Sequence, residues 1–125
     1  MKYANILAAS AVMAFTLNIG CSPTPTASFS ADVKPILDRY CAECHLEGGK
    51  GSQESGFRVD SHELVMKGTR YGPVIVPGDA ISSSLYRLVV GKVDPSIRMP
   101  HGKEKLSEKE IEAVKSWIAQ GAKND

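Results

Sequence analysis

The clearest pattern of hydrophobic and polar positions lies near the C-terminal end of the chain. Ser107 and Glu110 have the spacing of a capping box, which marks the start of a helix. Leu106 and Ile111 flank that start at the positions of a hydrophobic staple. The pattern predicts a helix that begins after Ser107 and ends at Gly121, since glycine often follows the last helical turn. Its buried stripe comprises Ile111, Val114, Trp117 and Ile118.

Three shorter helices are predicted from the same periodicity and from residues that start or stop helices. The first is capped by Ser30, and its apolar face consists of Val33, Ile36, Leu37 and Tyr40. The second opens at the capping-box spacing of residues 60–63 and is closed by Gly68. The third covers residues 82–90, with Gly91 as its terminator.

The segments between these helices are predicted to be loops. Residues 48–56 contain four glycines in nine positions, which indicates a mobile loop. Residues 71–78 are bounded by Gly-Pro and Pro-Gly, and no similar run exists to pair with them as a strand, so we expect an extended loop. Residues 92–105 hold two prolines and a glycine and form a third loop. The predicted fold class is therefore all-α, with about four short helices and loops as long as the helices.

The N-terminal residues have the pattern of an export signal. Lys2 is the only charged residue among the first 20, and residues 6–19 are almost entirely apolar or small. This pattern predicts a signal peptide over 1–20, and a retained membrane anchor is the alternative. The run ends on a glycine followed by Cys21, which resembles the bacterial lipobox, where the cysteine is lipidated. Cleavage near Ala27 by the ordinary signal peptidase, which would remove Cys21, is the other interpretation.

Composition and charge exclude several classes of protein and of binding partner. Residues 21–28 alternate proline and threonine, which favours an extended tether, and leaves residues 29–125 as the folded domain. The chain of 125 residues is 42% hydrophobic and 23% charged, which excludes collagen-like, coiled-coil and wholly disordered classes. Lys and Arg number 15 against 14 Asp and Glu, too balanced for a nucleic-acid or polybasic membrane binder. We expect a periplasm-facing domain that reaches the membrane through a lipid on Cys21.

One motif carries evident chemistry. Cys41, Cys44 and His45 form C-x-x-C-H, in which both thiols can reach the vinyl groups on one haem edge while the imidazole is directed at the iron. A zinc site would need a second cysteine pair, and a thioredoxin-like redox pair would need a βαβ context. A structural disulfide across so tight a spacing is a further alternative. Haem c is attached to proteins outside the cytoplasm, so the predicted export supports haem attachment. The motif therefore predicts one covalent haem c.

The second axial ligand has four candidates in the sequence. Met99 is a large apolar residue in a polar loop with no helical face to bury, so it needs a specific partner. Met66 lies beside other apolar residues in a short helix, where core filling is its expected role. His62 is expected on the solvated surface and His101, before a glycine, is expected to be exposed. Met99 is the predicted ligand.

An ordered set of motifs resembles class I c-type cytochromes, and more closely the planctomycete-type cytochrome c domain. The resemblance implies a small cytochrome c-like fold around one haem, with Met99 of the Met-Pro pair as distal ligand. It also implies a proline carbonyl that accepts from the other ring nitrogen of His45, which maps to Pro73 in the single downstream Gly-Pro. Leu46 departs from the pattern, because many members have glycine there. The matching stretches are 33–45, 56–61, 76–79, 84–86, 98–100 and 105–122.

The function expected from these features is one-electron transfer to and from redox partner proteins. His/Met ligation leaves no open iron position and raises the reduction potential. The sequence has no acid/base pair, nucleophile triad or second metal cluster, so an enzyme is not expected. Two alternatives stay open: a haem enzyme or gas-binding sensor with a displaceable sixth ligand, and a haem subunit of a larger redox complex.

Overall fold

The computed structural model describes residues 26–125, and within this range the chain is helical with no β-strand. The predicted all-α class is confirmed. The signal peptide and Cys21 lie outside the described residues. The elements are a π-helical turn η1 (Phe29–Val33), α1 (Lys34–Tyr40), α2 (Ala42–His45), α3 (Lys50–Ser55), α4 (His62–Lys67), α5 (Ser84–Val90), a 3₁₀ turn η2 (Pro95–Ile97) and α6 (Glu108–Ala119).

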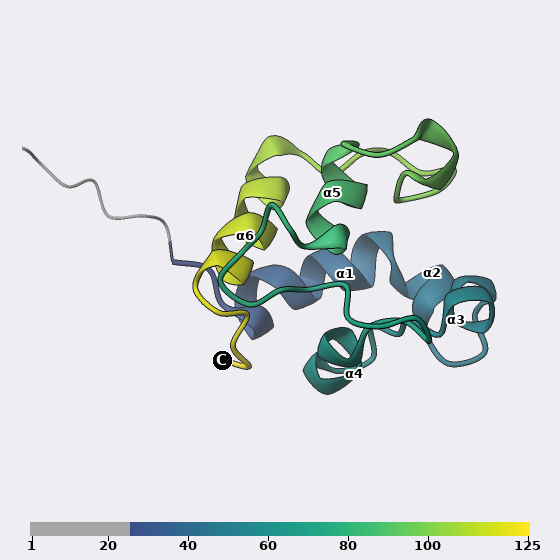
Figure 1. Ribbon diagram of the computed structural model, residues 1–125, viewed down its shortest axis with the longest axis horizontal. Helices are drawn as coiled ribbons and strands as arrows, with labels where there is room; N and C mark the ends of the chain where they lie inside the picture. The colour runs from purple at the N-terminus through teal and green to yellow at the C-terminus, as the bar shows by residue number, and fades with distance from the viewer. Residues whose placement is uncertain (1–25) are drawn as a thin grey trace, which may run out of the picture.

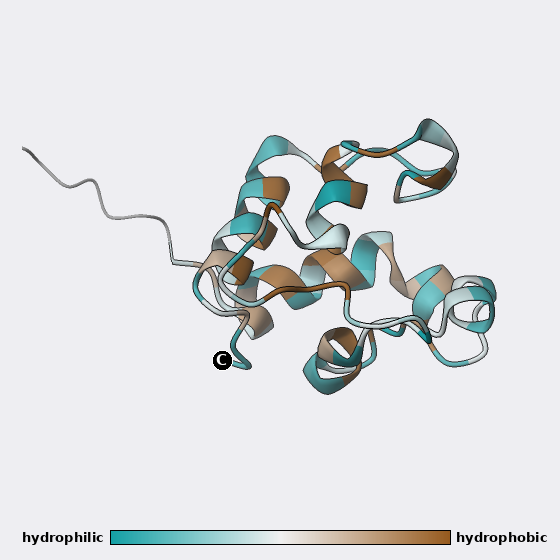
Figure 2. Ribbon diagram, viewed as in Figure 1, coloured by the Kyte–Doolittle hydropathy of each residue, from teal (hydrophilic) through white to brown (hydrophobic). Residues whose placement is uncertain are grey.

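The helices pack around one hydrophobic core. Helix α6 packs on η1 and on α5, while α2 continues from the far end of α1 and packs on α3 (Figure 1). Hydrophobic residues gather on α1, α5, α6 and the extended stretch before α5 (Figure 2). Val33, Trp117 and Ile118 are at most 1% exposed, which places the centre of this core between η1 and α6.

The first helix begins earlier than the sequence predicted. Its cap is Ser28, whose Oγ accepts from the backbone N–H of Ala31 at 3.1 Å, and Ser30 lies within η1 instead. The ends of the described chain are joined here, since the N–H of Phe29 donates to Oδ1 of Asp125 at 2.8 Å. This arrangement buries Phe29, which an N-cap at Ser30 would have left outside the helix.

The prediction of a mobile loop over 48–56 is wrong, because helix α3 occupies most of it. Serine side chains supply the local order that the glycines lack. The Ser52 hydroxyl donates to the carbonyls of Leu46 at 2.7 Å and Gly49 at 2.8 Å, and the Ser55 hydroxyl donates to the carbonyl of Gly51 at 2.7 Å. Glycine costs a helix only about 1 kcal/mol relative to alanine, so these bonds and the packing on α2 outweigh it.

The stretch before α5 is an extended loop, as predicted. Val74 and Ile75 are buried, and Ser83 is fully buried at the end of the loop. Its hydroxyl accepts from the N–H of Val76 at 2.9 Å and donates to the carbonyl of Asp79 at 2.7 Å. These bonds satisfy backbone groups that a strand would pair with a neighbouring strand, and α5 then starts at Ser84, two residues later than predicted.

Helix α6 has the capping box predicted from its sequence. The Ser107 hydroxyl accepts from the N–H of Glu110 at 3.3 Å, and Oε2 of Glu110 accepts from the N–H of Ser107 at 2.8 Å. The far end is fixed by Trp117, whose indole N–H donates to the carbonyl of Lys123 at 2.8 Å. Both ends of the helix are thus held by side chains.

Replacing Ser107 with alanine should lower the free energy of unfolding by about 1 kcal/mol, because the backbone N–H of Glu110 loses its acceptor. Urea-induced unfolding followed by circular dichroism measures the loss. Ser107→Asp is the control, because aspartate is an equally good N-cap and should keep the wild-type stability. Equal losses in both variants would contradict the capping role.

Candidate functional site

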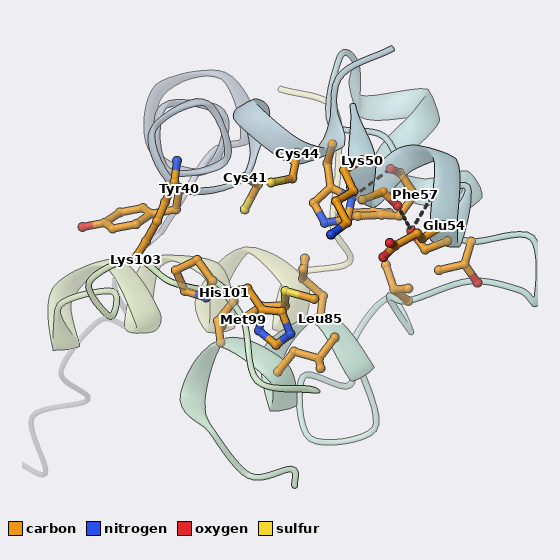
Figure 3. Close-up of a pocket in the computed structure, with 18 residues that line it drawn as sticks. Tyr40, Cys41, Cys44, Lys50, Glu54, Phe57, Leu85, Met99, His101 and Lys103 are labelled. Carbon is orange, nitrogen blue, oxygen red and sulfur yellow. Dashed lines mark hydrogen bonds between the residues drawn. The ribbon is translucent and has the colours of Figure 1, made fainter. Parts of the chain in front are cut away.

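A cavity of about 420 Å³ opens between the end of α1, the short helices α2 and α3, α5 and the 99–103 segment. Cys41, Cys44, His45 and Met99 all line it, and Figure 3 shows the two cysteines on one side and Met99 on the other. The volume lies in the range of small-molecule and cofactor sites, roughly 300–1,000 Å³. The four residues that the sequence predicted to hold a haem therefore meet at one cavity.

The two cysteines lie on one helical turn. Backbone N–H groups of Cys44 and His45 both donate to the carbonyl of Cys41, at 3.1 and 2.9 Å, which fixes their relative direction. Both thiols are free; Cys41 is half-buried and Cys44 is exposed. Burial raises the pKa of the Cys41 thiol to about 11, although nearby Lys103 acts in the opposite direction. Cys41 is therefore a neutral thiol at physiological pH.

The His45 ring has its tautomer fixed by the backbone. Its Nδ1 lies 3.1 Å from the carbonyl oxygen of Phe57, and a carbonyl can only accept, so Nδ1 carries the proton. Nε2 then keeps its lone pair for a metal. The predicted partner, Pro73, is wrong. Helix α3 and the turn after it return the chain beside α2 at Phe57, whereas Pro73 packs against Gly68.

Met99 reaches the cavity from the segment after α5. Its backbone N–H donates to the carbonyl of Leu88 at 3.3 Å, which ties the segment to the end of that helix. Figure 3 shows Met99 across the cavity from Cys41 and Cys44, with His101 beside it. His101 is exposed, as expected, and its Nδ1 lies 2.7 Å from the carbonyl of Arg98.

The other two ligand candidates lie away from the cavity. Met66 is partly buried and packs against the core, in the role expected for it. His62 was expected on the solvated surface, and that expectation is wrong. Its Nε2 lies 2.7 Å from the carbonyl of Ala122, and its ring meets those of Phe29 and Trp117 edge-on. His62 joins α4 to the C-terminal end of the chain.

The cavity wall is apolar where a planar cofactor would lie. Val74, Leu85 and Val89 line it and are buried within the fold. Lys50 and Glu54 of α3 and Lys103 stand at its polar edge. Two thiols, an imidazole with a free Nε2 and a thioether around an apolar wall fit a covalently held haem. Among residues 26–125 no group of three or more His, Cys, Asp and Glu side chains is gathered for a metal ion, so the zinc alternative lacks ligands there.

An all-α domain with Cys41, Cys44, His45 and Met99 on one cavity has the features of a c-type cytochrome. A comparison with protein families agrees: the model described as "Planctomycete cytochrome C" matches residues 41–101, a range that includes the C-x-x-C-H motif and Met99. The match covers just under half of the chain, and it confirms the resemblance to that family found in the sequence. No curated protein and no solved structure gives a match.

Two contributions to the site could not be found from the sequence. The carbonyl of Phe57 is a backbone group that every residue carries, so the residue type at position 57 does not reveal that this carbonyl binds His45. The close packing of α3 on α2 was hidden by the glycines of 48–56, although paired serines at 52 and 55 were an available signal for helical order.

None of the helices in residues 26–125 has the length and apolar character to cross a membrane.

Alkylation of the haem-free protein should distinguish the two cysteines. Cys44 is exposed and should react with iodoacetamide first, while the raised pKa of Cys41 leaves few thiolates at pH 8. Since the thiolate is the nucleophile, the rate at Cys41 should rise about tenfold per pH unit until the pH approaches its pKa. Peptide mass spectrometry measures both rates. Equal rates at pH 8 would show that the haem-free chain does not bury Cys41.

Proposed function

We propose that this domain is a single-haem electron carrier, with the cofactor bound covalently through Cys41 and Cys44 and its iron held by His45 and Met99. The observation that supports the proposal is the convergence of these four side chains, more than fifty residues apart at their extremes, on one cavity. The chain has one C-x-x-C-H motif, which supports one haem.

Each thiol would form its bond by simple addition. The S–H of Cys41 or Cys44 adds across a vinyl C=C, so that sulfur bonds one carbon and hydrogen the other, and nothing leaves. The spacing on α2 puts both sulfurs on the same side of the turn, toward one edge of a planar ring. Attachment at these two thiols would leave the imidazole of His45, the next residue, to bind the iron.

His45 and Met99 would occupy both axial positions. The bond from Nδ1 to the carbonyl of Phe57 orients the imidazole and makes Nε2 a better donor. A thioether opposite the histidine favours the ferrous state and raises the potential. A haem bound in this way supplies a one-electron couple, and with both positions filled the protein would accept and pass electrons without binding a substrate at iron.

The purified protein should retain its haem in acidified acetone and show a low-spin spectrum that carbon monoxide does not change. Met99→Ala should open the sixth position, so that the spectrum becomes sensitive to carbon monoxide and the potential falls. The potential should fall by a measurable amount within the roughly 0.8 V range over which axial ligands set haem potentials. Absorption spectra in a redox titration measure both effects.

Two other variants are controls for this experiment. Met66→Ala removes a methionine from the core, so it should lower stability and leave the spectrum low-spin. His101→Ala removes the other possible ligand on the 99–103 segment and should leave the spectrum unchanged. A wild-type protein that binds carbon monoxide would favour the gas-sensor or enzyme alternative, and an unchanged Met99→Ala spectrum would exclude this methionine as the ligand.

Export and lipidation at Cys21 form the second part of the proposal, and the sequence supports them. A signal, a cysteine and a proline-threonine tether stand in the order that a lipoprotein requires. Several acyl chains hold a protein at a membrane stably, whereas one chain holds it only marginally. A domain tethered in this way would meet membrane-associated redox partners at raised local concentration. Its near-zero net charge gives little long-range electrostatic steering, which the tether would make less necessary.

Cys21→Ser should therefore release the domain from the membrane fraction or leave its precursor uncleaved, with the haem spectrum unchanged in both cases. Cell fractionation followed by haem staining measures the distribution. A wild-type protein found in the soluble periplasmic fraction, with its mature terminus near Ala27, would instead indicate ordinary signal cleavage and a diffusible carrier.

A further inference from the structure

Helix α3 lies directly against the imidazole of His45. An ideal Cβ placed on Gly51 would stand 2.7 Å from Cε1 and 2.8 Å from Nε2 of the ring, and 3.0 Å from the carbonyl oxygen of Cys44. Carbon atoms in contact normally stand about 3.5–4.0 Å apart. The ring therefore occupies the space that any other residue at position 51 would need.

Hydrogen bonds hold the backbone of α3 close against α2. One residue before the helix, a Cβ on Gly49 would stand 2.5 Å from the carbonyl oxygen of Cys44, so α3 meets α2 backbone to backbone. The Ser52 hydroxyl holds this contact through the carbonyls of Leu46 and Gly49. At the other end, the N–H of Arg70 donates to the carbonyl of Ser55 at 2.9 Å.

The opposite side of the imidazole is held by Phe57. Its carbonyl accepts from Nδ1, and its ring meets the imidazole edge-on with centroids 5.3 Å apart. The hydrogen bond fixes one edge of the imidazole, and α3 blocks rotation of the Cε1–Nε2 edge about the Cβ–Cγ bond. Two contacts on different edges are sufficient to define the plane of the ring.

We propose that Gly51 is a positioning residue that sets the imidazole plane of His45, and that α3 is the rigid element that enforces it. This inference rests on the proposed function, in which Nε2 of His45 binds iron. The angle between the imidazole plane and the haem axes then follows from a helix packed on α2 rather than from the C-x-x-C-H motif itself.

The proposal and ordinary helix energetics predict opposite effects of Gly51→Ala. Alanine is the best helix former, so at an unconstrained helical position this change stabilises the helix and leaves the iron unaffected. If the ring occupies the space beside position 51, the methyl group must rotate the imidazole or displace α3. The haem ligation then changes even if the substitution raises the stability of the helix.

Electron paramagnetic resonance of the oxidised holoprotein measures the result, because the g-values of low-spin ferric haem depend on the orientation of the axial ligand planes. Gly51→Ala should shift the g-values from those of the wild type. Gln53→Ala is the matched control: it lies on the same short helix, is exposed, and its side chain contacts the carbonyl of Gly48 rather than the ring. Its g-values should equal those of the wild type.

Ser52→Ala provides a second test that adds no atom at the ring. Loss of its two hydrogen bonds should loosen α3 and broaden the g-features, and it decides the matter if Gly51→Ala does not retain haem. Wild-type g-values in Gly51→Ala, or in Ser52→Ala when the first variant loses haem, would overturn the positioning role and leave the proposed function intact. A wild-type spectrum without low-spin histidine ligation would overturn both.

Discussion

The whole site depends on the packing of the first helical segment against α6. Val33 of η1 and Trp117 and Ile118 of α6 are almost completely buried together, and this contact fixes the direction in which α1 points. The N–H of Cys41 donates to the carbonyl of Leu37 at 2.9 Å, so the ligand turn α2 follows the last turn of α1 without a flexible joint. The position of His45 is therefore decided at the opposite end of the molecule, by residues that never touch the cavity.

The other side of the cavity is built less firmly. Helix α5 is anchored by its buried face and by the hydrogen bonds of Ser83, but the 99–103 segment that carries Met99 has fewer internal contacts. One backbone bond joins it to Leu88, and an ion pair of 2.5 Å joins Lys103 to Glu43 on α2. That ion pair involves a largely exposed carboxylate, and exposed pairs contribute at most about 1 kcal/mol.

Sequence reasoning succeeded where order is local and failed where it depends on distant parts of the chain. The capping box of Ser107 and the apolar stripe of α6 involve residues a few positions apart, so their pattern is visible in the sequence. The cysteine spacing is equally local. Helix α3, by contrast, is stabilised by its fit against α2, and its glycines, needed for that fit, are the residues that argued for a loop.

The errors at Pro73 and His62 have the same origin. Phe57 contributes a carbonyl that replaces the expected one of Pro73, and only the path of the chain after α3 decides which carbonyl reaches His45. His62 was expected in solvent because it lies in the first turn of its helix, yet it packs on Phe29 and Trp117, which come from the two ends of the domain. In both cases the deciding partner lies far away in sequence or belongs to the backbone.

This uneven construction has a consequence for electron transfer. The proximal side, with α2, α3 and Phe57, is held by backbone hydrogen bonds and close packing that exist before any cofactor is bound. The methionine side is held by one backbone bond and surface charges, which a bond from Met99 to iron would reinforce. A ligand that binds only the folded arrangement stabilises it. In the proposed carrier, the potential would therefore be set by two contributions of different character: a rigid imidazole, and a methionine segment whose order would depend on the ligation that it completes.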